Sequence, residues 1–234
     1  MISFIIPAHN EEELLGRTLA AIAEASAHLE EANEVIVASD ASTDRTSEVA
    51  AKHGARGVTL HRRQIAAARN AGAREAIGDL LIFVDADTQI TASALQAALR
   101  ALRRGAAGGG ACVRFDGPVP VYATVLDYAF RLLLPLSGLA PGCFLFCTRE
   151  AYEKAGGFDE SLFASEEVFF AQRLKRLGRF VILREYVITS ARKLRTRSAL
   201  DLLLLGLRIA ATGPRSLTRR EGLDYWYGPR KSGP

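Results

Sequence analysis

The chain has 234 residues, 49% hydrophobic and 24% charged, which is enough for one well-cored domain and excludes wholesale disorder. No apolar run reaches the roughly 18 to 20 residues of a membrane span, and no signal peptide is evident. Three cysteines fit neither a metal spacing nor a disulfide framework, so we expect a cytoplasmic protein. The net charge of +4 is uneven, because ten Lys and Arg but only three Asp and Glu follow residue 190.

Strand-like and helix-like segments alternate along the first half of the chain. Apolar, β-branched runs predict strands at 2–6, 34–38, 58–60, 80–84 and 110–115. Helices are expected between them, and we expect Asn10 to cap the first, with Glu11–Glu13 in its first turn. This alternation predicts βαβ units, an α/β fold and a mainly parallel sheet flanked by helices.

The second half of the chain is less regular. We expect strands near 142–147 and 180–188, a short helix capped by Thr148, and a helix from Ser165, as its cap, to Gly178. Amphipathic or Leu-rich helices are expected at 121–135 and 198–211. This gives one domain over residues 1–190 and a basic extension over 191–234.

Polar side chains follow three predicted strands at the points where those strands end. Pro7-Ala8 closes the first strand, Asp40 ends the second, and Asp85-Ala86-Asp87 follows the apolar run 80–84. The carboxyl ends of parallel strands are where such sheets bind ligands. Two carboxylates one residue apart are suited to a hard divalent cation, Mg²⁺ or Mn²⁺. The pair is also compatible with ordinary solvated loop aspartates.

Four segments together resemble family 2 glycosyltransferases with the GT-A fold: SFIIPAHNEE (3–12), VIVASDASTDRT (35–46), RNAGAREAIGDLLIFVDADT (69–88) and GGFDESLFASEEVFFAQRLKRLG (156–178). The resemblance implies transfer of a sugar from a nucleotide-sugar to an unidentified acceptor, with a divalent metal and inversion at the anomeric carbon. It divides the domain into a nucleotide-sugar half (1–115) and an acceptor half (116–190).

The resemblance also implies roles for single residues. It places Pro7, Ala8 and Glu11 at the base and ribose, Asp40 on the nucleobase, Arg63 or Gln64 beside the base, Asp85 near the ribose, and Asp87 on the metal.

The adjacent acids Glu166 and Glu167 stand where the family usually carries Glu-Asp, whose second acid is the general base. Glu167 is therefore the first candidate base and Glu166 the second. Two departures from the family pattern are the Glu-Glu pair itself and Ser39–Ser42, where an Asp-Asp-Gly-Ser run is common.

The basic residues at the end of the domain allow two interpretations each. Arg192 and Lys193 either clamp the diphosphate or form a solvated turn. The Leu-rich segment 198–211, with basic flanks, either packs on the domain or lies on an anionic membrane at the inner face, where a lipid-linked acceptor would be met.

Other functions were also considered. FVDADT (83–88) fits the pattern of haloacid-dehalogenase-like phosphatases, with Asp85 as nucleophile, although that motif usually follows the first strand. A non-catalytic scaffold would bind lipid or, less favourably, nucleic acid through the basic extension. A dinucleotide-binding oxidoreductase is disfavoured, because no G-x-G-x-x-G follows the first strand.

Overall fold

The computed structural model describes residues 1–117, 119, 140–195, 217–218, 220–223 and 227–228. The helices expected at 121–135 and 198–211 lie outside these residues. The elements in chain order are β1 (Ile2–Ala8), α1 (Leu15–Ser26), β2 (Asn33–Asp40), α2 (Thr46–Lys52), β3 (Arg56–Leu60), α3 (Ile65–Glu75), β4 (Leu80–Val84), β5 (Thr88–Gln89), α4 (Ala92–Arg103), β6 (Gly108–Asp116), β7 (Phe144–Thr148), α6 (Arg149–Ala155), α7 (Glu166–Leu177), β8 (Phe180–Ser190) and α8 (Arg192–Arg195).

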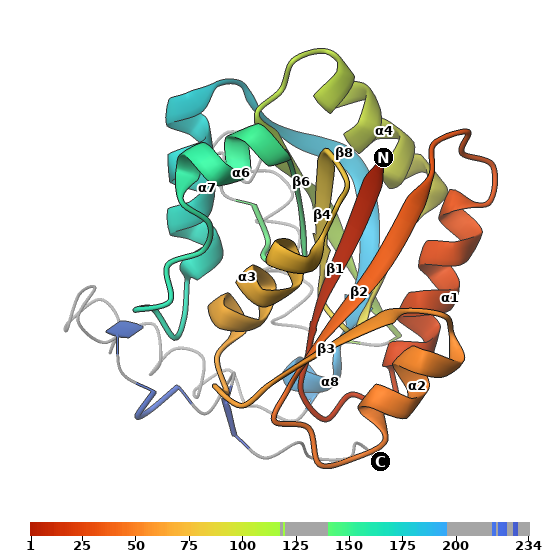
Figure 1. Ribbon diagram of the computed structural model, residues 1–234, viewed down its shortest axis with the longest axis vertical. Helices are drawn as coiled ribbons and strands as arrows, with labels where there is room; N and C mark the ends of the chain where they lie inside the picture. The colour runs from red at the N-terminus through yellow and green to blue at the C-terminus, as the bar shows by residue number, and fades with distance from the viewer. Residues whose placement is uncertain (118, 120–139, 196–216, 219, 224–226, 229–234) are drawn as a thin grey trace.

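The described strands form one sheet in the order β3-β2-β1-β4-β7-β6-β8-β5 (Figure 1). The pairs β3–β2, β2–β1, β1–β4 and β6–β8 are parallel. β7 runs antiparallel to both β4 and β6, and the short β5 runs antiparallel to β8. The prediction of a mainly parallel sheet is therefore confirmed, with β7 and β5 as its reversed strands.

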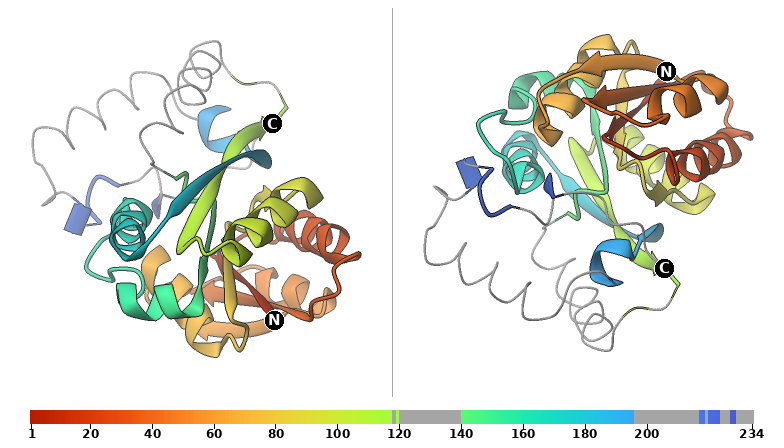
Figure 2. Two further views of the ribbon diagram at one scale, coloured as in Figure 1. Left: turned by 90° about the horizontal axis from the view of Figure 1, so that it is seen from above. Right: turned by 90° about the horizontal axis from the view of Figure 1, so that it is seen from below.

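Helices cover both faces of the sheet (Figures 1 and 2). On one face, α1, α2 and α4 pack against a core that includes Phe4, Ile82 and Phe146. On the other face, α3, α6 and α7 pack against Ile5 and Phe83. Because neighbouring residues of β1 and β4 point to opposite, equally buried faces, these strands are apolar throughout rather than alternating.

The first helix begins later than predicted, and the prediction that Asn10 caps it is wrong. α1 begins at Leu15, so Glu11–Glu13 lie in the preceding loop. The backbone N–H of Asn10 donates to Ser42 Oγ at 3.2 Å, and the Asn10 Oδ1 accepts from the Thr43 N–H at 2.8 Å. These residues bind the loop after β2 instead of starting a helix.

The second half follows its sequence signals more closely. Thr148 caps α6 as predicted, because its hydroxyl accepts the N–H of Ala151 at 3.1 Å. α7 has the predicted bounds, from the residue after Ser165 to the residue before Gly178. Ser165 occupies the cap position, but its side chain makes no capping hydrogen bond, so its predicted role is wrong in that respect.

Candidate active site

A pocket opens where β1, β2 and β4 end, at the carboxyl edge predicted from the sequence. The pocket encloses about 610 Å³ of space, a volume that includes open solvent at its mouth. The lining residues are Pro7, Ala8, His9, Glu11, Asp40, Arg63, Gln64, Ile65, Ala68, Asp85, Ala86, Asp87 and Tyr227. The structure thus brings together every residue predicted for the nucleotide and the metal.

Asp40 organises the wall of this pocket. Its Oδ1 accepts the backbone N–H groups of Arg62 and Arg63 at 2.7 and 2.8 Å, and its Oδ2 accepts that of Gln64 at 2.6 Å. The carboxylate is buried. Three of its roughly four lone-pair positions are therefore used to hold the loop before α3, which leaves little capacity for a nucleobase.

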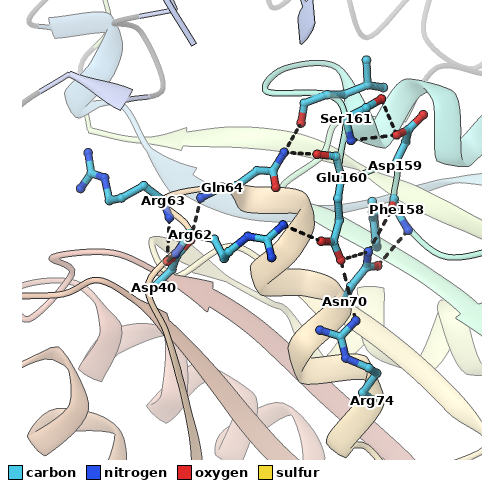
Figure 3. A network of polar contacts seen from close by, with 11 residues as sticks. Asp40, Arg62, Arg63, Gln64, Asn70, Arg74, Phe158, Asp159, Glu160 and Ser161 are labelled. Carbon is cyan, nitrogen blue, oxygen red and sulfur yellow. Dashed lines mark hydrogen bonds and ion pairs between the residues drawn. The ribbon is translucent and has the colours of Figure 1, made fainter. Parts of the chain in front are cut away.

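Gln64 also faces the protein more than the pocket. Its side-chain amide donates to the carbonyl oxygens of Glu160 and Leu162, the latter at 3.2 Å (Figure 3). The Glu160 carboxylate in turn accepts from Asn70 Nδ2 at 3.0 Å and lies 3.5 Å from an Arg62 nitrogen. This network joins the loop between β3 and α3 to the segment that leads into α7.

Asp87 forms an ion pair with Arg192. Nη2 of Arg192 lies 3.1 Å from Asp87 Oδ2 and 2.6 Å from both carboxylate oxygens of Glu11. Glu11 is buried, so its carboxylate is stabilised by this pairing rather than by a helix dipole. The two acids, from the loops after β1 and β4, therefore converge on one cation position. Of Lys193, the structure gives only its place in α8.

Arg69 is a site residue that the sequence analysis did not identify. Its Nη2 donates to Asp85 Oδ1 at 3.0 Å and to the Gly142 carbonyl at 2.9 Å, and its Nη1 donates to Glu166 Oε1 at 2.8 Å. The side chain is 3% exposed. The two neighbouring acids hold its pKa well above the ordinary value against the opposing effect of burial.

The structure distinguishes the two candidate bases. Glu166 is buried and paired with Arg69, whereas burial, together with the negative charge of Glu166, raises the pKa of Glu167 to about 7. Arg69 opposes this rise. A side chain at Gly142 would collide with Glu167, because an added Cβ would lie 2.9 Å from Glu167 Cγ. The pKa of Glu167 is thus close to the value that a general base needs at neutral pH.

Backbone strain gathers around the same site. Among the described residues, the non-glycine residues with positive φ are Asn10 (50°), Ala41 (53°), Arg63 (52°) and Ser165 (60°). Each lies in a loop that borders the pocket or precedes Glu166. Strained conformations of this kind persist where surrounding contacts fix them, and they concentrate at functional sites.

Metal-ligating side chains are sparse here. Among the described residues, no group of three or more His, Cys, Asp or Glu side chains is placed to hold a metal ion. Asp87 and Glu11 supply hard oxygen ligands around a position that now holds a guanidinium nitrogen. This donor set fits Mg²⁺ or Mn²⁺, which keep waters and substrate phosphates as further ligands.

The sheet order and the pocket at its carboxyl edge are those expected from the resemblance to proteins with the GT-A fold. Residues 3–185 match the family described as Glycosyl transferase family 2, and the chain belongs to this family. The validoxylamine A glucosyltransferase of Streptomyces hygroscopicus subsp. jinggangensis is 38% identical over 91 residues, 36% of this chain and 21% of that protein. The 4,4'-diaponeurosporenoate glycosyltransferase of Staphylococcus haemolyticus is 35% identical over 113 residues, which are 44% of this chain and 28% of that protein. The chain thus matches less than a third of either protein.

Solved structures share the fold at lower identity. The mannosyltransferase PcManGT from Pyrobaculum calidifontis, in complex with GDP-Man and Mn²⁺, aligns with a TM-score of 0.68 and 19% identity, covering 96% of this chain and 69% of its own. TarS 1-349 from S. aureus, in complex with UDP-GlcNAc, aligns with a TM-score of 0.64 and 17% identity, and the alignment covers 96% of this chain and 78% of TarS 1-349. These likenesses establish the GT-A fold. None of these comparisons supports the phosphatase or the scaffold.

Proposed function

We propose that this chain transfers a glycosyl group from a nucleoside-diphosphate sugar to an acceptor hydroxyl, with a divalent cation and with inversion at the anomeric carbon. The observation that carries this proposal is the convergence of acids and cations at one strand edge. The pocket holds Asp85 and Asp87, and Arg69 connects Asp85 to the acids at the start of α7. A donor and an acceptor would therefore meet between the two halves of the domain.

The donor diphosphate is assigned to the Asp87 end of the pocket. When bound, Mg²⁺ or Mn²⁺ on Asp87 would neutralise the charge that develops on the leaving diphosphate. Arg192, which now pairs with Asp87 and Glu11, is close enough to contact the same phosphates, and Lys193 follows it in α8. We therefore keep Arg192 and Lys193 as the clamp on the diphosphate.

Glu167 is assigned the general base. Its carboxylate takes the proton of the acceptor hydroxyl while that oxygen bonds to the anomeric carbon and the bond to the diphosphate breaks. A single displacement of this kind inverts the anomeric centre. Burial and the negative charge of Glu166 raise the pKa of Glu167, and the ion pair of Glu166 with Arg69 holds Arg69 in place. The base is therefore ready at neutral pH.

The assignment of Pro7, Ala8, Arg63 and Asp85 to the nucleoside is supported by their common place in the pocket lining. Asp40 and Gln64 act through the loop that they hold. Glu11 is reassigned from the ribose to the cation position, because its carboxylate binds Arg192.

Two parts of the proposal, a lipid-linked acceptor and a contact with an anionic membrane, rest on the sequence alone. The ten basic residues after residue 190 support a surface contact, and a lipid-linked acceptor would suit it. Among the described residues, no helix is long and apolar enough to cross a membrane.

Turnover of nucleotide-sugars tests the proposed function. UDP- and GDP-linked sugars are incubated with the protein, Mn²⁺ and a panel of hydroxyl acceptors, and nucleoside diphosphate release and glycosylated product are measured together. Equal release and product formation with at least one pair supports transfer. Release of inorganic phosphate with no glycosylated product from any pair would contradict it.

A further inference from the structure

The described part of the C-terminal extension lies against the candidate active site. Leu217 and Leu223 are buried in a cluster with Leu162 and Ala164, and Phe163, Phe169 and Tyr227 pack on this cluster. The N–H of Phe163 donates to the carbonyl of Leu217 at 2.7 Å. The extension is therefore joined to the segment that leads into α7 and to Glu166 and Glu167.

Tyr227 is the residue through which this extension reaches the pocket. Tyr227 is one of the residues that line the pocket, as are Arg63, Gln64 and Ile65. Its ring packs edge-on against Phe163, with centroids 5.8 Å apart, and Arg63 Nη2 donates to its carbonyl at 3.1 Å. The Tyr227 hydroxyl is buried near the Ile65 amide and within electrostatic reach of Glu166 and Arg69. The Arg220 guanidinium lies 5.3 Å from the centroid of its ring.

The sheet order shows which part of a ligand this ring would meet. β1 separates β2, which ends at Asp40, from β4, which leads to Asp87. Strands in a sheet are about 4.8 Å apart, so the two ends of the pocket are roughly 10 Å apart. The acids Glu11 and Asp87 lie at the β1–β4 end, whereas the Tyr227 carbonyl accepts from Arg63 in the loop after β3. A nucleoside whose diphosphate lay at Asp87 would extend along the pocket toward this loop and Tyr227.

We propose that Tyr227 is a ligand-binding residue whose ring forms the wall against which the planar base of the donor nucleoside packs. The C-terminal extension thereby completes the donor site. This inference rests on the proposed function, because it assumes a nucleoside diphosphate in the pocket. An aromatic ring suits this position, because every base has a π-face and stacking on a side chain does not require a particular base.

Binding of UDP, GDP and inorganic pyrophosphate, each with Mn²⁺, tests the proposal by calorimetry. Y227L keeps an apolar side chain against Phe163 but removes the ring, and Y227F removes only the hydroxyl. Y186L is the matched control, because Tyr186 packs under the Arg114 guanidinium, outside the pocket lining. Y227L should weaken UDP and GDP by about 5- to 150-fold, the range for losing one stacked base, and leave pyrophosphate unchanged. Y227F and Y186L should bind as wild type.

Pyrophosphate separates loss of a base contact from collapse of the pocket. An equal loss of pyrophosphate and nucleotide binding in Y227L would overturn the proposal, since Tyr227 would then only hold the pocket together. Unchanged nucleotide binding in Y227L would also overturn it and leave the proposed function standing. A wild-type protein that binds no nucleotide at all would overturn both.

Discussion

At the scale of single residues, two adjacent acids at the start of α7 differ in their surroundings. Glu166 is fixed by a buried arginine, whereas Glu167 is half-buried and has no such partner at hydrogen-bond distance among the described residues. A buried ion pair loses several kcal/mol when one partner is removed, so Glu166 and Arg69 belong to the framework of the site. The proton transfer belongs to Glu167.

Glu167→Gln should lower turnover by about 10²–10⁴-fold, the usual contribution of general-base catalysis. The amide keeps the shape of the side chain but cannot take a proton. Nucleotide affinity should change little, because the base faces the acceptor. The reverse pattern, in which Glu166→Gln abolishes turnover while folding normally and Glu167→Gln does not, would show that the bases were assigned in the wrong order.

The raised pKa of Glu167, about 7 instead of 4.5, predicts two opposite effects of pH. The base acts when ionised, so kcat/KM should rise with pH to a plateau above about 7. The folded state favours the protonated carboxyl, so its contribution to stability is full below pH 4.5 and is lost as the pH rises through 7. The unfolding free energy of wild type, relative to Glu167→Gln, should therefore decrease over this interval. A difference that does not change with pH would refute the raised pKa.

At the scale of elements, the position of α7 depends on how α3 holds the preceding segment. Asn70 on α3 donates to the Phe158 carbonyl at 2.8 Å and accepts the Phe158 N–H at 2.9 Å. Its Oδ1 also accepts the Tyr152 hydroxyl at 2.8 Å. One buried amide thus joins α3, α6 and the segment that leads to the acids of α7.

Asn70→Asp should destabilise the fold by roughly 2–4 kcal/mol, because the carboxylate oxygen that replaces the donating Nδ2 would face the Phe158 carbonyl and the Glu160 carboxylate. Urea unfolding measures this change. Asn33→Asp, the same substitution at an exposed position of β2, is the control and should be nearly neutral. Equal midpoints for the two variants would contradict the role given to Asn70.

Secondary structure was predictable where the signal is local. The bounds of β4 were predicted at Leu80 and Val84, because an apolar run ends there at polar neighbours. The start of α1 was not, because Asn10 and the following acids bind the loop after β2, some 32 residues away. Tertiary contacts of this kind leave no periodic pattern in the sequence.

The site residues, too, were predictable only where their signal is local in the sequence. Asp85 and Asp87 were found from their place after a strand, and the structure puts both in the pocket. Arg69 was missed, because its partner Glu166 is 97 residues away and a single buried arginine has no local signature. The pairing of Glu11 with Arg192, 181 residues apart, is likewise visible only in three dimensions.

At the scale of the whole molecule, the basic C-terminal extension has two roles in this account. Its described residues border the active site through Arg192 and Tyr227. Its excess positive charge is the basis for the proposed membrane contact. The two roles are compatible, because the proposed diphosphate clamp uses only Arg192 and Lys193 of the ten basic residues.

The full-length protein should bind anionic vesicles at low ionic strength, since each Lys or Arg near such a surface contributes roughly 1 kcal/mol. Binding should weaken with added salt, which screens exposed charges. Co-sedimentation with phosphatidylserine-containing vesicles measures this, and vesicles of neutral lipid are the control. A folded protein that ignores anionic vesicles at low salt would refute the contact.

The central claim is that the pocket binds a nucleoside diphosphate with a divalent cation at Asp87. Calorimetric titration of UDP and GDP, with and without Mn²⁺, tests it most directly. The account predicts saturable binding of at least one nucleotide that tightens with Mn²⁺, loses this dependence in Asp87→Ala, and keeps it in Asp79→Ala, an exposed aspartate far from the pocket. Binding to Asp87→Ala with the same Mn²⁺ dependence as wild type would contradict it.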